Sequence, residues 1–320
     1  MKIVVLERNS VGLDVSVDCF KDFGEMVCYS NTVTEEEVAL RCVDADIIVA
    51  NKAPLNEASL KECKNLKLIC EFATGYDNCA LEYLKNRNVL VCNVKDYSTD
   101  MVAQHSFALA LMLCENLSFY DDYVKSGKYS AQDRFSNFDA PISELAGKTW
   151  GIIGMGNIGQ KVAKIATAFG CRVFFHSVTG KSKVTDYPMV DKDTLLAESD
   201  FLSIHCPLSD LTRDFIDADA LKKMKKSAIL INVARGPVVN NTDLFNALEA
   251  GEITAAGLDV LEKEPLENSN PLSKIMDSGR LVITPHNAWA SFEARNRLVL
   301  GVYGNIKNFL AKTPTNVVNG

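Results

Sequence analysis

Short apolar runs alternate with segments of helical period along the first 94 residues of the chain. Because the runs are apolar along nearly their whole length, they predict strands that are buried on both faces of a sheet. These strands are expected at residues 3–6, 26–29, 46–50, 66–72 and 89–94. The helices expected between them lie at residues 13–23, 35–42, 56–63 and 81–86. The alternation predicts an α/β fold with a parallel sheet and right-handed crossovers.

A second alternating series begins near residue 147 and predicts a second parallel sheet. Its strands are expected at residues 149–153, 172–175, 201–205, 228–233, 256–260 and 281–284. Between the two series, residues 97 to about 125 predict a long helix with Ser98 as its N-cap, and residues 126–145 predict a loop or arm. A last helical pattern over residues 291–310 would return the chain to the first domain. A chain of 320 residues is also expected to form two domains. The two alternating series predict that each is a doubly wound α/β domain.

The strand expected at residues 149–153 runs directly into a Gly-x-Gly-x-x-Gly motif formed by Gly154, Gly156 and Gly159. An apolar pattern of helical period follows at Val162, Ile165, Ala166 and Phe169. This order is typical of a dinucleotide site: the first glycine makes the turn, the second admits the pyrophosphate and the third packs the helix closely. The free N–H groups at the helix start would attract phosphates. The alternative is an ordinary turn, because glycines by themselves also mark turns.

Composition narrows the class of protein. Hydrophobic residues make up 47% of the chain and charged residues 23%, as in a soluble globular protein. With 34 Lys and Arg against 41 Asp and Glu, the net charge is -7, so nucleic acid is not an expected partner. The longest apolar run, residues 107–114, is far shorter than the ~18 residues of a membrane span. Ten cysteines without a Cys-x-x-Cys pair predict reduced thiols in a cytoplasmic protein, and no metal site.

Chemically capable side chains follow three strands of the second series. These are Arg235, Asp259 and His286, with Glu264 just beyond Asp259. Ligands of doubly wound sheets bind at the carboxyl ends of the strands, so we expect these side chains at the site. Arg235 would hold a carboxylate bidentately, and His286 would donate a proton to the adjacent carbonyl oxygen as hydride arrives. Glu264 would favour the protonated imidazole. The set predicts hydride transfer between a nicotinamide cofactor and a 2-keto acid.

Each of these residues also has a structural interpretation. Arginines at strand ends often form surface salt bridges, and Glu264 would then be a solvated loop residue. Among the other histidines, His105 is expected to pack within its apolar helix, whereas His176 and His205 end strands toward the adenine side of the site.

The residues after the second strand of this series bear on the choice of cofactor. NAD-selective folds place a carboxylate about 20 residues beyond the glycines, where it accepts hydrogen bonds from the ribose 2′-hydroxyl. Here that position is Ser177, and Lys181 and Lys183 follow it. Hydroxyls and lysines can bind a 2′-phosphate, which favours NADP(H) slightly over NAD(H). A solvated loop with incidental lysines is the alternative, and it would leave dual use or a weak NAD preference.

Several motifs together resemble the D-isomer-specific 2-hydroxyacid dehydrogenase family over nearly the whole chain. The matching pieces are residues 73–78, 97–104, 144–148 with the glycine motif, 205–208, 232–236, 257–260 with Glu264 and Pro265, and 284–286. Within the family, residues 97–100 and 286–289 are most similar to glycerate dehydrogenases, also called hydroxypyruvate reductases. The resemblance implies a flavodoxin-like substrate domain at residues 1–97 and 289–320, and a Rossmann cofactor domain at residues 98–288.

The resemblance also implies roles for individual residues. Arg235, Glu264 and His286 would be catalytic, and Thr74 to Tyr76, with Gly75 between them, would help Arg235 and His286 bind the substrate. Asp259 would contact the nicotinamide carboxamide. Cofactor contacts would come from Val102, Gly154, Gly156, Asn157, Ile158, Gly159, Ser177, Lys181, Cys206, Pro207 and Val233.

A homodimer is expected from the resemblance, with the helix from residue 97 and the arm packed on the partner. The apolar run at residues 107–114 points the same way, because it is too apolar for an exposed surface. The favoured activity is reduction of hydroxypyruvate or glyoxylate. The alternatives are a dehydrogenase for a larger D-2-hydroxy acid and a nucleotide-sensing interaction protein of the corepressor type, which keeps the same fold and site.

Overall fold

The computed structural model describes all 320 residues, which divide into two compact units. Unit 1 contains Met1–Ser98 and Ala290–Gly320, and unit 2 contains Thr99–Trp289. Each unit is built on one sheet in which all strands are parallel. The predicted fold class, two doubly wound α/β domains, is therefore confirmed.

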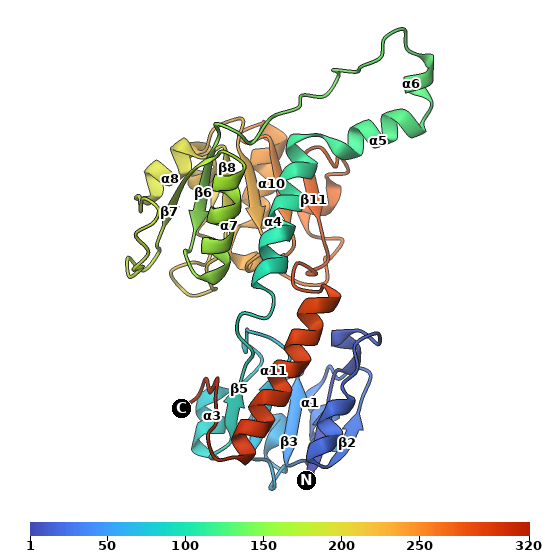
Figure 1. Ribbon diagram of the computed structural model, residues 1–320, viewed down its shortest axis with the longest axis vertical. Coiled ribbons are helices and arrows are strands. Elements are labelled where there is room, and N and C mark those ends of the chain that lie inside the picture. Colours follow the sequence, from blue (N-terminus) through green and yellow to red (C-terminus); the bar gives the residue numbers. More distant parts are fainter. The chain divides into compact units, whose positions relative to one another are not determined.

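The sheet of unit 1 has the strand order β2-β1-β3-β4-β5, which is the flavodoxin-like order. Its strands are β1 Lys2–Val5, β2 Glu25–Cys28, β3 Ile47–Ala50, β4 Leu68–Glu71 and β5 Leu90–Cys92. The α-helices of this unit are α1 Glu35–Cys42, α2 Glu57–Leu60, α3 Leu81–Asn86 and α11 Phe292–Leu310, of which Figure 1 labels α1, α3 and α11. Strands β3 and β4 are buried at every residue, as the continuous apolar runs predicted.

No α-helix forms over residues 13–23, where the pattern predicted one. Instead, the short 3-10 helix η2 Asp18–Phe23 forms within this segment, and another, η1 Arg8–Val11, precedes it. The Arg8 guanidinium donates to the carbonyl oxygens of Gly12 and Val15, at 2.7 and 2.6 Å. The Ser16 hydroxyl accepts from the backbone N–H of Asp18 at 3.1 Å. These side chains bind the backbone groups that a helix would have used, which explains why the prediction was wrong.

The sheet of unit 2 has six strands in the order β11-β10-β9-β8-β6-β7. They are β6 Thr149–Ile153, β7 Arg172–His176, β8 Phe201–Ile204, β9 Ile229–Asn232, β10 Ala255–Leu258 and β11 Leu281–Ile283. The helices are α4 Thr99–Cys114, α5 Leu117–Lys125, α6 Lys128–Ala131, α7 Asn157–Ala168, α8 Lys192–Glu198, α9 Ala218–Lys223 and α10 Asn241–Ala250, with 3-10 turns η3 Gly236–Val238 and η4 Pro271–Lys274. One parallel bridge, Phe175 to Met189, takes the place of a further strand beside β7 and completes the Rossmann order around β6.

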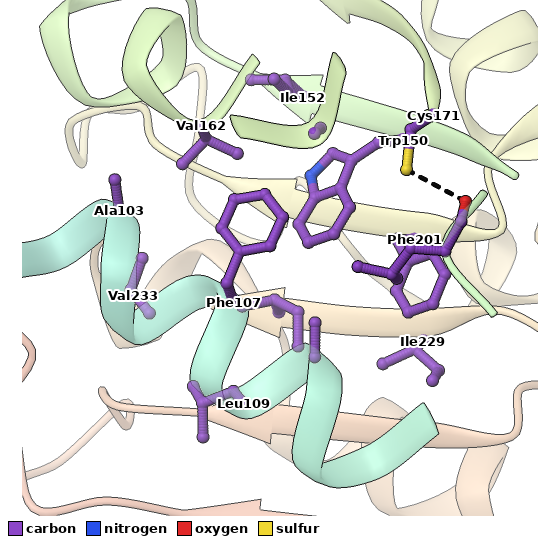
Figure 2. Packing of buried hydrophobic residues seen from close by; sticks show 14 of the residues in the cluster. Ala103, Phe107, Leu109, Trp150, Ile152, Val162, Cys171, Phe201, Ile229 and Val233 are labelled. Atoms are coloured by element: carbon purple, nitrogen blue, oxygen red, sulfur yellow. Dashed lines mark hydrogen bonds between the residues drawn. The ribbon is translucent and has the colours of Figure 1, made fainter. Parts of the chain in front are cut away.

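Helices cover both faces of this sheet, so each face has its own apolar core. Trp150 and Ile152 of β6 belong to one core, and Ile153 belongs to the other. Helices α4 and α7 lie side by side over the first face, where Figure 2 shows Phe107 of α4 against Trp150, with ring centroids 4.5 Å apart. Helices α8, α9 and α10 supply the second core. The alternation of sides along each strand fixes which residues face the helices.

The long helix predicted from residue 97 to about 125 is interrupted. Helix α4 ends at Cys114 and α5 begins at Leu117, with Asn116 between them in the left-handed region at φ 51°. Asparagine adopts this conformation more readily than most residues, and here its Nδ2 donates to the Pro141 carbonyl at 2.6 Å. Within unit 2, α5, α6 and the loop after them extend away from the sheet (Figure 1). We call residues 117–142 the arm.

The apolar run at residues 107–114 contributes to the core of its own unit, so its apolar character does not by itself require a partner surface. Phe107, Leu109 and Leu113 are buried in the core of their own unit. Seven of the exposed large apolar side chains lie farther along the chain, in the arm. They are Leu117, Phe119, Val124, Tyr129, Phe135, Phe138 and Ile142.

Candidate active site

Three neighbouring strands of unit 2 end level with one another and deliver the candidate catalytic residues. Asn232 of β9 pairs with Leu258 of β10, which pairs with Ile283 of β11. Arg235, Asp259 and His286 follow these paired residues within three positions. Because the strands are parallel, all three residues emerge at the carboxyl edge of the sheet, where ligands of such folds bind.

The structure brings Glu264 and His286 together. The Nδ1 atom of His286 lies 2.6 Å from Oε2 of Glu264, and the two side chains are 30% and 34% exposed. The other carboxylate oxygen of Glu264 accepts the backbone N–H of Leu261 at 3.0 Å. The carboxylate is thus held in place by its own loop, and it fixes the imidazole through Nδ1. The second ring nitrogen, Nε2, is the one left to meet a ligand.

Asp259 holds the backbone that carries His286. Its main-chain oxygen accepts the N–H of His286 at 2.9 Å, and its carboxylate accepts those of Asn287 and Ala288 at 2.9 and 2.8 Å. His286 has φ 54°, in the left-handed region that is uncommon for residues with a Cβ. Three consecutive N–H groups bound to one buried aspartate stabilise this turn, which sets the direction of the histidine ring.

Asn232, a residue that the sequence did not single out, shapes the turn that carries Arg235. Its Oδ1 accepts the N–H of Ala234 at 3.1 Å, and its Nδ2 donates to the carbonyl of Arg235 at 3.0 Å. The next residue, Gly236, is also required here, since a Cβ at this position would collide with the carbonyl of Leu261. The loop that carries Glu264 therefore lies directly against the turn that carries Arg235.

The glycine motif has the geometry of a dinucleotide-binding turn. Gly154 adopts φ 90°, and its backbone approaches the end of β8 so closely that a Cβ would lie 2.8 Å from the N atom of Cys206. Helix α7 begins at Asn157 after Gly156, which has no neighbouring atoms that a Cβ would meet. A Cβ on Gly159 would collide with the carbonyl of Gly154, so the helix packs tightly on the turn. The first N–H groups of a helix make no hydrogen bonds within the helix, so the start of α7, which contains Asn157 and Ile158, is suited to bind phosphate.

The position that selects the cofactor lies in a turn after β7. The carbonyl of Ser177 accepts the N–H of Gly180 at 2.8 Å, and Lys181 follows as an exposed residue. His176, at the end of β7, uses Nδ1 to contact the carbonyl of Val190 at 2.9 Å. No carboxylate occupies the position of Ser177.

Several other residues expected to bind cofactor line the same edge or the core beneath it. Val102, Val233 and Cys206 are buried, and burial raises the pKa of the Cys206 thiol to about 11, so it stays protonated at neutral pH. Pro207 follows as an exposed residue. His205 is half-buried beside this turn, and desolvation of its ring lowers its pKa to about 3, so it is uncharged at neutral pH.

The residues expected to cradle a substrate carboxylate belong to unit 1, in the loop after β4. The Thr74 hydroxyl donates to the carbonyl of Val94 at 2.8 Å, and the Asn93 amide donates to the carbonyl of Thr74 at 2.7 Å. Gly75 and Tyr76 follow, and the carbonyl of Tyr76 accepts the N–H of Cys79 at 3.0 Å. The loop is therefore anchored at both ends.

Glu71, at the end of β4, is a buried acid beneath this loop that the sequence did not mark. Its Oε1 accepts from Cys79 Sγ at 3.0 Å and from Asn78 Nδ2 at 3.3 Å. Desolvation raises its pKa to about 8, although these two hydrogen bonds act in the opposite direction. Glu71 is thus protonated at neutral pH. Glu71 lies inside the mostly apolar segment 66–72, whereas the sequence-based candidates were chosen among residues that follow a strand.

No helix is both long enough and apolar enough to cross a membrane. No group of three or more His, Cys, Asp or Glu side chains is arranged to hold a metal ion.

Comparison with known proteins identifies relatives along the full chain. The family model described as "D-isomer specific 2-hydroxyacid dehydrogenase, NAD binding domain" matches residues 107–288, more than half of the sequence. A hydroxypyruvate reductase of Blautia hydrogenotrophica is 36% identical over 324 residues, covering 100% of both chains. A glycerate dehydrogenase of Methylorubrum extorquens is 38% identical over 317 residues, covering 99% of this chain and 98% of that protein.

Solved structures share the arrangement as well. An acyclic imino acid reductase in complex with NADPH and D-Arg has a TM-score of 0.88 and 30% identity, covering 99% of this chain and 100% of that one. The D-lactate dehydrogenase of Aquifex aeolicus, in complex with NAD and lactic acid, has a TM-score of 0.85 and 28% identity, covering 100% and 99%. Both neighbours hold a nicotinamide dinucleotide.

Proposed function

Since this chain belongs to the D-isomer-specific 2-hydroxyacid dehydrogenases, we propose that it reduces a short 2-keto acid, with hydroxypyruvate and glyoxylate favoured. The chain is an oxidoreductase that acts on the CH–OH group of 2-hydroxy acids with a nicotinamide cofactor. The names of the full-length relatives support the choice of substrate.

The contact between His286 and Glu264 is the observation that carries the proposed mechanism. An imidazole that contacts a carboxylate through Nδ1 is held in one orientation, and Nε2 is then the ring nitrogen that can exchange a proton with the substrate. In reduction, His286 would protonate the carbonyl oxygen of the substrate, and a bound nicotinamide cofactor would supply the hydride for the keto carbon. Oxidation reverses both transfers, and His286 takes the proton back.

Arg235 is proposed to bind the substrate carboxylate. Its turn begins at the end of β9, level with the strands that deliver Asp259 and His286. A planar guanidinium can donate two parallel hydrogen bonds to a carboxylate and remains charged at all relevant pH values. The backbone of Thr74, Gly75 and Tyr76 would assist, a proposal that rests on the family resemblance.

A panel of 2-keto acids tests the choice of substrate. We expect kcat/KM for NAD(P)H-dependent reduction to be highest with hydroxypyruvate or glyoxylate, and lower with pyruvate or with 2-keto acids that carry branched side chains. A preference for the branched acids would instead favour the alternative, a dehydrogenase for a larger D-2-hydroxy acid.

The cofactor is proposed to be NADP(H), by a small margin over NAD(H). Support comes from Ser177 at the position of the usual carboxylate and from exposed Lys181 in the following turn. The test compares kcat/KM with NADPH and NADH for the native chain, Ser177→Asp, Lys181→Ala and the remote control Lys226→Ala. We expect Lys181→Ala to weaken use of NADPH alone. A native preference for NADH of about tenfold, with Lys181→Ala unchanged toward NADPH, would reject the phosphate site.

A homodimer is proposed as the working assembly. The exposed apolar side chains of the arm support it, since Phe135 and Phe138 are 90% and 76% exposed on a segment that leaves the body of unit 2. A second copy of the chain is the expected cover for these side chains.

A further inference from the structure

His105 of helix α4 contacts the end of β11 through a polar side chain. Its Nε2 lies 2.9 Å from Oγ1 of Thr284, two residues before His286 in the sequence. The side chain is 14% exposed. The sequence predicted that His105 only packs within an apolar helix, and packing does not account for this polar contact.

The direction of the hydrogen bond between His105 and Thr284 follows from the second contact of Thr284, which is with Asp259. The Thr284 hydroxyl lies 2.6 Å from Oδ1 of Asp259. Both carboxylate oxygens of Asp259 already accept backbone N–H groups, so this carboxylate acts as an acceptor and the threonine hydrogen must point to it. The oxygen of Thr284 can then only accept from His105. His105 therefore carries a hydrogen on Nε2.

The surroundings of His105 fit that assignment. Desolvation lowers its pKa, and the opposing attraction of Asp259 is the smaller effect. The ring is then neutral at physiological pH, with one N–H group, and that group is directed at Thr284. A chain of donors runs from His105 through Thr284 to Asp259.

Asp259 is the residue that fixes the backbone of His286, Asn287 and Ala288. We propose that His105 is a positioning residue for the reaction, acting through Thr284 and Asp259 to hold the turn that aims His286. The inference rests on the proposed role of His286 as proton donor. It assigns to α4 a part in catalysis in addition to its part in the core.

Loss of the His105 donor leaves the oxygen of Thr284 without its partner and frees the hydroxyl to rotate away from Asp259. A displaced catalytic group can lower the rate by more than the loss of the hydrogen bond itself accounts for. We expect His105→Phe to lower kcat about tenfold. The dissociation constant for the cofactor and the thermal midpoint should change little, because Phe fills the space of the ring.

Conservative variants separate this role from packing. Gln can place an N–H near the position of Nε2, so His105→Gln should recover most of the lost kcat, and Thr284→Ser should outperform Thr284→Val. The double variant His105→Phe/Thr284→Val should be no slower than the slower single variant, because both remove one chain of hydrogen bonds.

The experiment measures kcat, KM, cofactor affinity by fluorescence and thermal midpoint for these variants and for His286→Gln. A native kcat in His105→Phe overturns the proposal, as do additive losses in the double variant. So does a loss in His105→Phe that His105→Gln fails to recover, since that result indicates packing alone. Full turnover in His286→Gln would instead contradict the proposed function, whatever the His105 variants do.

Discussion

Arg235 offers the sharpest test of substrate binding at the level of one residue. Arg235→Lys keeps a positive charge but loses the planar pair of donors, so we expect kcat/KM for the 2-keto acid to fall by about 10- to 100-fold. Arg235→Ala should fall further. Steady-state kinetics measure both, and fluorescence titration should show cofactor affinity close to native. Near-native kcat/KM in Arg235→Lys would contradict a bidentate contact.

Glu264 should control how His286 is positioned. Its carboxylate oxygen lies 2.6 Å from Nδ1 and so holds the imidazole in one orientation. Glu264→Gln keeps a polar side chain of similar shape but removes the charge from this contact, so we expect kcat/KM for reduction to be partly lost at unchanged cofactor affinity. The matched control is Glu267→Gln, a nearby carboxylate that pairs with Lys263 instead. Steady-state kinetics that give a native kcat/KM for Glu264→Gln would count against the pair.

Glu71 predicts a pH effect on stability. Its ordinary pKa of 4.5 rises to about 8 in the folded chain, mainly through desolvation, with Glu7 adding to the shift and Lys52, Cys79 and Asn78 opposing it. The folded state therefore holds a proton that the unfolded chain releases. The contribution of Glu71 to the free energy of unfolding is therefore largest below pH 4.5. It falls by about 1.4 kcal/mol per pH unit as the pH rises from 4.5 to about 8.

The comparison is between the native chain, Glu71→Gln and the exposed control Glu82→Gln. The free energy of unfolding is measured with urea at pH 5, 6, 7 and 8, a range of about three units. With each rise in pH, the value for Glu71→Gln should increase relative to that of the native chain. The difference between Glu82→Gln and the native chain should stay constant. Parallel curves for all three would mean that Glu71 is ionised in the folded state.

At the level of residues, the sequence indicated candidates where a polar side chain lies just past a strand. Arg235, Glu264 and His286 were selected because parallel strands end at one edge; their catalytic roles stay predictions, and the structure shows the contact between the last two. Glu71 and Thr284 were not found, since one lies inside an apolar run and the other acts only through Asp259. His105 contacts Thr284 across 179 positions of sequence, which no local pattern reveals.

At the level of elements, the strands could be predicted because helices cover both faces of each sheet, which makes the strands apolar along nearly their whole length. Predicted and observed strands overlap throughout, and residues 149–153 match β6 at both ends. The failures occurred where side chains bind the backbone. Arg8 and Ser16 do so in residues 13–23, and Asn116 ends the helical run early. Such bonds depend on geometry that periodicity does not contain.

The packing of two loops predicts the effect of one methyl group. In Gly236→Ala the new Cβ would collide with the carbonyl of Leu261, so the loop that carries Glu264 must move. We expect a fall in kcat of at least about tenfold with cofactor affinity retained. Gly304→Ala in helix α11 is the control, because no atom lies near its Cβ position and activity should be native. Native kcat in Gly236→Ala would show that this approach is not needed.

At the level of the whole molecule, the arm predicts the assembly. Phe135→Asp together with Phe138→Asp places charge on the two most exposed apolar side chains of the arm, so a dimer held by the arm should dissociate. Light scattering at micromolar concentration should give a dimer mass for the native chain and a monomer mass for the variant. A native chain that is already monomeric would contradict the proposed assembly.

The central claim is that this chain transfers hydride between a nicotinamide cofactor and a short 2-keto acid with His286 as the proton donor. The most direct measurement follows nicotinamide absorbance during reduction of hydroxypyruvate by the native chain and by His286→Gln, with cofactor affinity measured in parallel. We predict rapid oxidation of the cofactor by the native chain, and a loss of at least about a hundredfold in the variant at unchanged cofactor affinity. Equal turnover by both chains would contradict the account.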